Sequence, residues 1–208
     1  GWCVMAEDHI IDLGVRAFDR AEVADSGEPL NLQRRMARLM RHRIQHRRAR
    51  LVKLARTLVA HGLIPNQHFF KPANPHTGED SLWALRVKAL SEKVGPEEWA
   101  RILYHICKHR GFHWVSRAEQ KKAESESQSE GGKIKQGLQN IRQLMQAKGY
   151  ESVAQMLLAE FPEAQRNKQG EYTKAVPRAL LDKELALLFE RQAQFGNPHA
   201  TASLKEAI

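Results

Sequence analysis

The feature that most limits how this chain can fold is a segment of dense positive charge with no acid to balance it. Between Arg34 and Arg50 the sequence RRMARLMRHRIQHRRAR contains eight arginines and no aspartate or glutamate. From Pro29 to Gly78, nine Arg and two Lys give a charge of +11, whereas the remaining 22 basic and 24 acidic residues sum to −2. One segment thus supplies all of the net charge of +9, which indicates a localised element that binds a polyanion.

The same segment has the periodicity of one long helix. Turn-forming residues at Ser26, Gly27 and Pro29 precede it, the pattern continues to about Ala60, and Gly62 is suited to end it. At ~100° per residue, the apolar residues fall into one sector, which we expect to pack on protein. The members of this apolar sector are Leu32, Met36, Leu39, Met40, Ile44, Leu51, Leu54, Ala55 and Leu58.

Basic residues occupy the opposite side of this predicted helix and also enter its apolar sector. The opposite side carries Arg34, Arg35, Arg38, Arg41, Arg48, Lys53 and Arg56, and the intruding residues are Arg43, Arg47 and Arg50. A charged helix face is usually just solvated, but such a face normally pairs Glu with Lys at i, i+4, and no carboxylate occurs here. Arginine favours bidentate phosphate contacts, and a membrane helix would keep its apolar side clean. We therefore expect a helix that lies between nucleic acid and protein, or between two nucleic-acid segments.

The rest of the sequence predicts a mainly α-helical protein with a short N-terminal β-hairpin. Two strand-like runs, Trp2 to Ala6 and Ile10 to Phe18, form the hairpin, which needs a partner sheet or is held loosely. Amphipathic helices are expected at Ser81–Val94, Pro96–His109, Lys133–Lys148, Glu151–Phe161 and Arg178–Phe195. Residues from about 117 to 133 lack large apolar side chains and predict a mobile linker.

Composition excludes several classes of protein. Cys3 and Cys107 are too few for a disulfide framework, which favours a reducing environment. No apolar run approaches the roughly 20 residues of a membrane span, and the first residues lack the order of a signal peptide. We therefore expect a soluble, cytoplasmic protein without a membrane partner. The chain starts at Gly1 in a strand-like pattern and stops at Ile208 in a helical one, so we expect both ends to be cut.

A histidine-rich stretch, YHICKHRGFH, raises the question of a metal site. His105, His109 and His113 are spaced four apart, and two histidines at i, i+4 can share a metal ion. A self-sufficient metal-dependent nuclease built on His105 and His109 is thus one alternative. We expect that these residues do not bind a metal. The HExxH glutamate is absent, Cys107 belongs to an apolar stripe, and Gly111 should end the helix before His113 can align with the other two histidines.

Two further groups of basic residues are candidates for contact with RNA. They are Lys108, His109 and Arg110 at the end of a predicted helix, and Arg166, Lys168, Tyr172, Lys174 and Arg178 in a polar loop. For the first group, RNA contact and simple stabilisation of the helix dipole are equally good explanations. For the second group, RNA contact and a solvated loop are equally good explanations. Trp83, Trp99 and Trp114 are expected in cores. No catalytic triad, Walker loop or GxGxxG motif occurs, so we assign no catalytic residue.

Four stretches in order make the chain resemble a known family. They are IIDLGVRAFDRAEV, the Arg-rich helix, EEWARILYHICKHRGF and RNKQGEYTKAVPRALLDKELALLFERQAQFGNP. Together they resemble the N-terminal part of the RNA-guided DNA endonuclease of type II CRISPR systems, most closely its compact type II-C members. The resemblance implies that residues 1–25 are a remnant of the RuvC nuclease segment, residues 26–62 the bridge helix, and residues 63–208 a helical recognition domain.

The resemblance also implies partners and a limit on activity. Members of the family hold a guide RNA and target DNA as a heteroduplex, use Mg²⁺ for cleavage and serve bacterial antiviral defence. Of the family's opening motif, GLDxGxxSxGW, this chain has only Gly1 and Trp2, so the catalytic aspartate is absent and we expect neither cleavage nor a cofactor here. Guide RNA, target DNA, the remainder of the nuclease and an inhibitor protein that imitates RNA are the expected partners. A free-standing basic RNA-binding protein is the third alternative.

Overall fold

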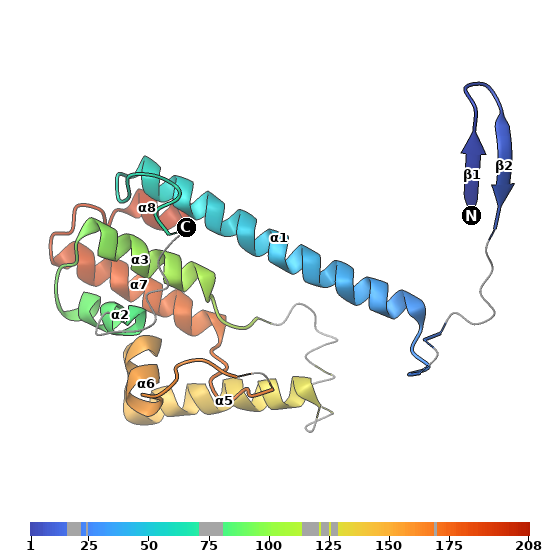
Figure 1. Cartoon of the computed structure of the whole chain (residues 1–208). Coiled ribbons are helices and arrows are strands. Elements are labelled where there is room, and N and C mark those ends of the chain that lie inside the picture. The colour runs from blue at the N-terminus through green and yellow to red at the C-terminus, as the bar shows by residue number, and fades with distance from the viewer. Residues whose placement is uncertain are drawn as a thin grey trace. The chain divides into compact units, whose positions relative to one another are not determined.

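The computed structural model describes residues 1–15, 22–23, 25–70, 81–113, 121, 125, 129–168 and 170–208. The chain forms two compact units, Gly1–Arg48 and Ala49–Ile208. Its elements are β1 (Trp2–Met5), β2 (Ile10–Gly14), α1 (Leu30–Ala60), α2 (Leu82–Ser91), α3 (Pro96–Lys108), α5 (Glu130–Lys148), α6 (Val153–Glu160), α7 (Arg178–Gln194) and α8 (Ala202–Ala207) (Figure 1). The predicted fold class, mainly α with an N-terminal hairpin, is confirmed.

The N-terminal hairpin is the only sheet among the described residues. β1 and β2 pair antiparallel, with Trp2 opposite Gly14 and Cys3 opposite Leu13. The predicted second strand is shorter than expected, because β2 ends at Gly14, and part of the predicted remainder lies outside the described residues. Its apolar side chains stay exposed, Leu13 at 63%, because two strands alone cannot enclose a core.

Helix α1 has the bounds that its sequence pattern predicts. It ends at Ala60, and Gly62 follows with a φ of +70°, a conformation that glycine adopts without strain. The Gly62 N–H donates to the Val59 carbonyl and the Leu63 N–H donates to the Leu58 carbonyl, each at 3.0 Å. This pair of bonds is a Schellman motif, so the local sequence terminates the helix.

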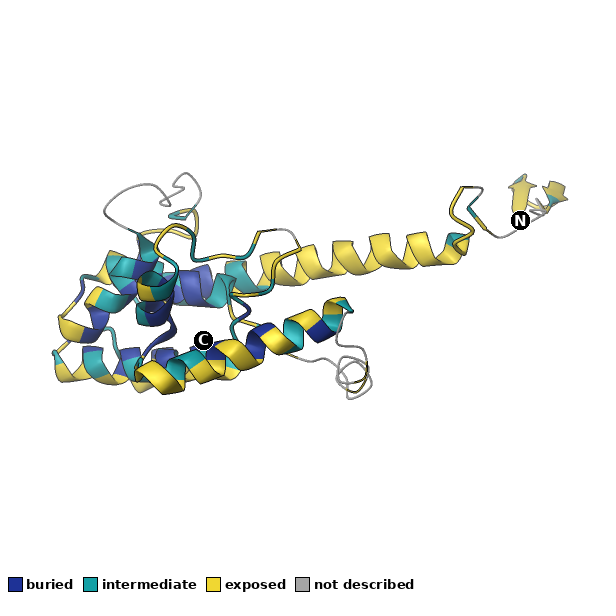
Figure 2. Ribbon diagram, turned by 90° about the horizontal axis from the view of Figure 1, so that it is seen from below, coloured by how far each residue is buried: buried dark blue, intermediate teal, exposed yellow. Residues whose placement is uncertain are grey.

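The apolar sector of α1 does not pack along its whole length, which corrects our expectation. Leu54, Ala55 and Leu58 are buried at 5%, 4% and 0% exposure. Met36 and Ile44, however, are each 60% exposed, and the residues around them are drawn as exposed in Figure 2. The reason is that only the last turns of α1 enter the core of the Ala49–Ile208 unit, and no described element covers the earlier turns.

The Ala49–Ile208 unit contains two hydrophobic clusters. The first joins the end of α1 to α2, α3, α7 and α8, and Trp99 lies fully buried in it with its ring centroid 5.0 Å from that of Phe189. The second joins α2, α5, α6 and α7 around Trp83 and Met156. Trp83 and Trp99 are core residues as predicted, while Trp114 lies outside the described residues.

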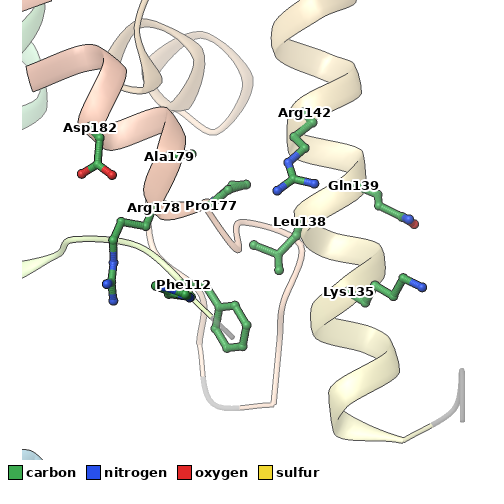
Figure 3. Close-up of a pocket in the computed structure, with 10 residues that line it drawn as sticks. Phe112, Lys135, Leu138, Gln139, Arg142, Pro177, Arg178, Ala179 and Asp182 are labelled. Carbon is green, nitrogen blue, oxygen red and sulfur yellow. The ribbon is translucent and has the colours of Figure 1, made fainter. Parts of the chain in front are cut away.

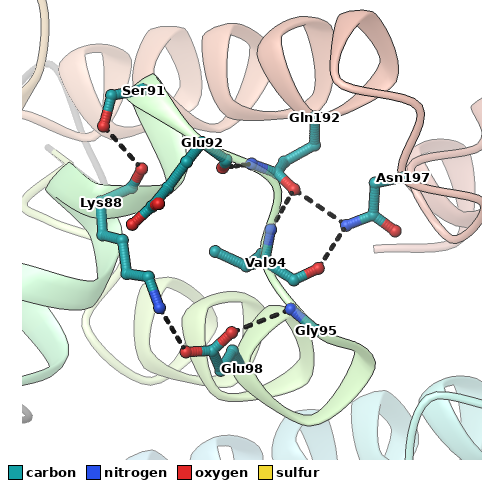
Figure 4. Close-up of polar contacts among 8 residues, drawn as sticks. All are labelled: Lys88, Ser91, Glu92, Val94, Gly95, Glu98, Gln192 and Asn197. Carbon is teal, nitrogen blue, oxygen red and sulfur yellow. Dashed lines mark hydrogen bonds and ion pairs between the residues drawn. The ribbon is translucent and has the colours of Figure 1, made fainter.

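Two side-chain amides, one in the last turn of α7 and one just after that helix, hold the turn between α2 and α3 (Figure 4). The Gln192 amide nitrogen donates to the carbonyls of Ala89 and Glu92 at 2.7 Å, and its oxygen accepts from the Val94 N–H at 3.1 Å. Asn197 donates to the Val94 carbonyl and to Gln192. Since Gln192 and Asn197 are buried, these bonds satisfy backbone groups that would otherwise be unpaired in the core.

The predicted linker at about 117–133 is wrong at its end. Helix α5 already begins at Glu130, because the Ser129 hydroxyl accepts from the Gly132 N–H and Glu130 suits the positive end of the helix dipole. Residues 117–120, 122–124 and 126–128 of that linker lie outside the described residues. The division into 1–25, 26–62 and 63–208 stays a prediction.

Candidate nucleic-acid interface

The arginines of α1 in the Gly1–Arg48 unit are exposed on all sides of the helix. They are Arg34, Arg35, Arg38, Arg41, Arg43, Arg47 and Arg48. Across the described part of the chain, no ion pair involves any of them. The stacked rings of His42 and His46, with centroids 6.1 Å apart, lie on the same helix. Because like charges on one helix repel, an anionic partner would relieve a cost that the helix cannot relieve by itself.

The last basic residues of α1 belong to the Ala49–Ile208 unit and differ from one another in how far they are exposed. Lys53 and Arg56 are exposed, but Arg50 is partly buried, and its Nε donates to the Cys107 carbonyl at 3.2 Å. Arg50 therefore holds the end of α3 in addition to contributing charge. Burial raises the pKa of the Cys107 thiol to about 11, although the neighbouring Arg50 and Arg110 act in the opposite direction.

The structure brings together the two groups of basic residues that the sequence presented separately. The His109 Nε2 and the Arg166 Nη2 lie 2.6 Å apart, and the Lys174 Nζ donates to the Arg166 carbonyl at 3.3 Å. Phe112 ties the two segments, because its N–H donates to the Val176 carbonyl at 2.8 Å and its carbonyl accepts from the Arg178 N–H at 2.9 Å. Lys108, Arg110, Lys168 and Arg178 belong to these same two segments.

Tyr172 connects the polar loop to helix α5. Its hydroxyl donates a hydrogen bond to the Glu130 carboxylate, which raises the pKa of Tyr172. The polar loop therefore docks on the start of α5. Gly137 permits this approach, since a Cβ at that position would lie 2.0 Å from the Tyr172 carbonyl oxygen. The tyrosine thus positions the loop, and RNA stacking on it stays a prediction.

His105 lies in the interior beside a buried ion pair. It is 2% exposed, and its Nδ1 lies 3.3 Å from the Arg86 Nη1. The Arg86 Nε donates to the Glu184 carboxylate at 2.8 Å, and the second oxygen of Glu184 accepts from the Val153 N–H at 2.9 Å. Burial lowers the pKa of Arg86, and Glu184 opposes that shift. A guanidinium this close to His105 disfavours a metal cation there.

Two features that the described residues lack bear on other classes of site. Within them, no three or more His, Cys, Asp or Glu side chains are grouped so that they could hold a metal ion. No helix in the described parts of the chain combines the length and the apolar character that a membrane span requires.

Sequence analysis missed the basic residues of α5. Lys135 and Arg142 line a pocket together with Phe112 and Arg178 (Figure 3). No sequence signal marked these two cations, because single basic residues on an amphipathic helix are usually just solvated. Only the docking of the polar loop and of the segment after α3 against α5 makes them part of a site.

Fold and charge distribution together are those of a helical protein suited to a polyanionic partner. The chain is 31% identical over 212 residues to the CRISPR-associated endonuclease Cas9 of Campylobacter jejuni subsp. jejuni, a match that covers 94% of this chain and 20% of the relative. The crystal structure of C. jejuni Cas9 in complex with sgRNA and target DNA matches with a TM-score of 0.69 at 25% identity, over 99% of this chain and 27% of that chain. The chain is thus similar in sequence and in fold to part of Cas9, and it spans about one fifth of that relative's length.

A more distant structure shows the same fold. The St1Cas9 assembly with sgRNA, tDNA20 and AcrIIA6 matches with a TM-score of 0.58 at 20% identity, over 85% of this chain and 20% of that chain. No profile of a protein family matches the sequence. The resemblance to RNA-guided CRISPR endonucleases noted in the sequence is therefore confirmed by sequence and structural similarity to Cas9.

Proposed function

We propose that this chain binds guide RNA through its phosphates, as the bridge-helix and recognition part of an RNA-guided DNA endonuclease. The observation that carries the proposal is the set of exposed α1 arginines, for which no described carboxylate serves as an ion-pair partner. The basic residues around His109 and Arg166 support it from the Ala49–Ile208 unit. The sgRNA in the similar C. jejuni Cas9 structure also supports it.

Binding of this kind follows from the release of counterions. A protein that neutralises Z phosphates of a duplex releases the cations condensed on them, so log K falls against log salt with a slope near −0.9Z. Because phosphates carry no sequence information, the affinity should depend little on the RNA sequence. Shape and backbone would select the RNA, while base pairing with target DNA would supply specificity.

Anisotropy titrations of a structured RNA at several salt concentrations test this proposal. The triple variant Arg34→Gln, Arg38→Gln, Arg41→Gln should lower the magnitude of the salt slope by about three, since each lost phosphate contact removes about one. Lys205→Gln on α8 is the matched control and should leave the slope nearly unchanged. A salt-independent affinity, or a triple variant that behaves like Lys205→Gln, would contradict phosphate binding by α1.

Three further partners follow from the same proposal. Target DNA would be held as a heteroduplex with the guide, and the rest of the nuclease would cover the exposed apolar residues of β1, β2 and α1. An acidic inhibitor protein would compete with RNA for the arginines, because its carboxylates would imitate phosphates. An inhibitor that binds the RNA complex, and that the triple arginine variant does not affect, would rule out this competition.

We also propose that this chain does not cleave nucleic acid by itself, and that Mg²⁺ acts only in the intact family. The cytoplasm of a bacterium is its expected location. Support comes from the burial of His105 against Arg86. Incubation of DNA and RNA with the protein and Mg²⁺ or Mn²⁺ should leave both intact. Cleavage that persists through purification and disappears in His105→Ala, His109→Ala would instead favour the metal-dependent nuclease.

A further inference from the structure

A pocket lies between α5, the start of α7 and the segment that follows α3. Its volume is about 660 Å³, within the roughly 300–1,000 Å³ of small-ligand sites. Figure 3 shows Leu138 and Arg142 pointing from α5 toward Phe112 and Pro177, with Arg178 on the α7 side. Leu138 and Arg142 are four residues apart and so share one face of α5.

Backbone hydrogen bonds hold the segment around Phe112, which contributes the aromatic side chain of this pocket. Both backbone hydrogen bonds of Phe112, to Val176 and Arg178, are 2.9 Å or shorter. Gly111 has a φ of +74°, and a Cβ there would lie 2.8 Å from the Val176 carbonyl oxygen. Glycine is therefore required at this position, and the local geometry fixes the backbone from which the ring of Phe112 projects.

The charge of the pocket is mainly positive. Arg142, Arg178 and Lys135 contribute three cations, His113 lines the same space, and Asp182 is the only carboxylate among the described residues that line it. The Nε of Arg178 is buried and has no hydrogen-bond partner among the described residues. A buried donor without an acceptor is costly.

An aromatic ring and aliphatic side chains beside arginines match the chemistry of a nucleotide. Phe112, Leu138 and Pro177 offer apolar surface for a base, and Arg142 and Arg178 offer donors for a phosphate. Asp182 offers an acceptor for a base amino group but would repel a second phosphate. A base inside a duplex is stacked on both faces, so only an unpaired nucleotide can place its base against the ring.

We infer that this pocket binds one unpaired, unstacked nucleotide of the RNA, with its base on Phe112 and its phosphate on Arg142 and Arg178. This inference rests on the proposed function, because it assumes that RNA is the ligand. It adds recognition of a local RNA feature to binding that otherwise depends on phosphates alone. The pocket would thereby set the register of a structured RNA that contains a bulge.

Three short RNA hairpins test the inference: one fully paired, one with a single bulged adenosine, and one with an abasic bulge. The wild-type chain should bind the adenosine bulge about tenfold more tightly than the other two, the size expected for one stacked base. Phe112→Leu should abolish that preference, whereas Phe195→Leu, which removes an aromatic ring outside the pocket, should retain it. Arg142→Gln should lower the salt slope by about one for the adenosine bulge alone.

Each alternative result has one meaning. Equal, salt-dependent affinity for all three hairpins would overturn the pocket and leave the proposed function intact. A preference that the abasic bulge shares would mean that the protein recognises bent RNA instead of a base. A preference for adenosine that Phe112→Leu retains would place base recognition outside this pocket and overturn the inference. Loss of salt-dependent binding to every hairpin would overturn the proposed function and, with it, this inference. Thermal melting by circular dichroism checks that Phe112→Leu remains folded.

Discussion

The two parts of helix α1 have the same sequence pattern and different surroundings. In the Gly1–Arg48 unit, Ile44 is 60% exposed, and in the Ala49–Ile208 unit, Leu58 is fully buried. The arginines differ in the same way, since Arg41 is exposed and Arg50 bonds to the Cys107 carbonyl. The comparison teaches that helical periodicity identifies a face that can be buried, whereas burial itself depends on what the rest of the chain brings to that face.

The largest expected effect separates a buried arginine from an exposed one. Arg86→Met leaves Glu184 buried without its cation and should lower the free energy of unfolding by about 3–5 kcal/mol. Arg41→Gln should change it by less than about 0.5 kcal/mol. Urea unfolding followed by tryptophan fluorescence measures both. In salt titrations of RNA binding, Arg41→Gln should reduce the slope and Arg86→Met should not.

A double variant sharpens that first prediction. Arg86→Met combined with Glu184→Leu removes both charges and should recover part of the lost stability, because no isolated charge remains in the core. Recovery should be incomplete, since the Val153 N–H then loses its acceptor. If Arg86→Met alone is as stable as wild type, the ion pair is not the buried element that the structure describes.

The apolar residues of the two parts of α1 provide the second comparison. Leu58→Ala creates a cavity in the core and should lower the free energy of unfolding by about 2–5 kcal/mol. Ile44→Ala removes an exposed side chain and should change the free energy of unfolding by less than about 0.5 kcal/mol. Chemical denaturation of the two variants under identical conditions measures the difference. Comparable losses would show that the face around Ile44 is covered in solution.

The third prediction concerns the arginines that enter the apolar sector. Arg47→Leu removes an exposed, repelled charge and should leave the melting temperature unchanged or slightly higher. Arg50→Leu breaks the hydrogen bond to the Cys107 carbonyl and should lower the free energy of unfolding by about 1 kcal/mol. Thermal melting compares them, with RNA affinity measured in parallel. Stabilisation by both variants would mean that the hydrogen bond of Arg50 contributes nothing to stability.

The smallest expected effect concerns the two cysteines. The thiolate is the reactive form, and a pKa of about 11 leaves little of it on Cys107 at neutral pH. Cys3 is exposed, so iodoacetamide should label Cys3 first, and labelling of Cys107 should accelerate as pH rises toward 11. Peptide mass spectrometry after a timed reaction resolves the sites. Equal labelling rates of Cys3 and Cys107 at pH 7 would show that the Cys107 environment opens to solvent.

Local rules predicted the elements well. Gly62, Pro96 and the apolar spacings placed α1, α3 and α7 close to their observed bounds, because capping and periodicity act within a few residues. The start of α5 was missed, since the absence of apolar residues before Lys133 outweighed the weak capping signal of Ser129. The hairpin was recognised, but β2 proved shorter than predicted.

The candidate site was predictable only in part. Sequence alone determined that α1 is a helix and that it has no acid to neutralise it, because both depend on nearest neighbours and composition. Tertiary structure decided that Arg50 binds a carbonyl, that His105 lies inside beside Arg86, and that Phe112 and Arg142 face one pocket. These pairs are far apart in sequence or on different elements, and their contacts arise only when burial of the two clusters brings the helices together.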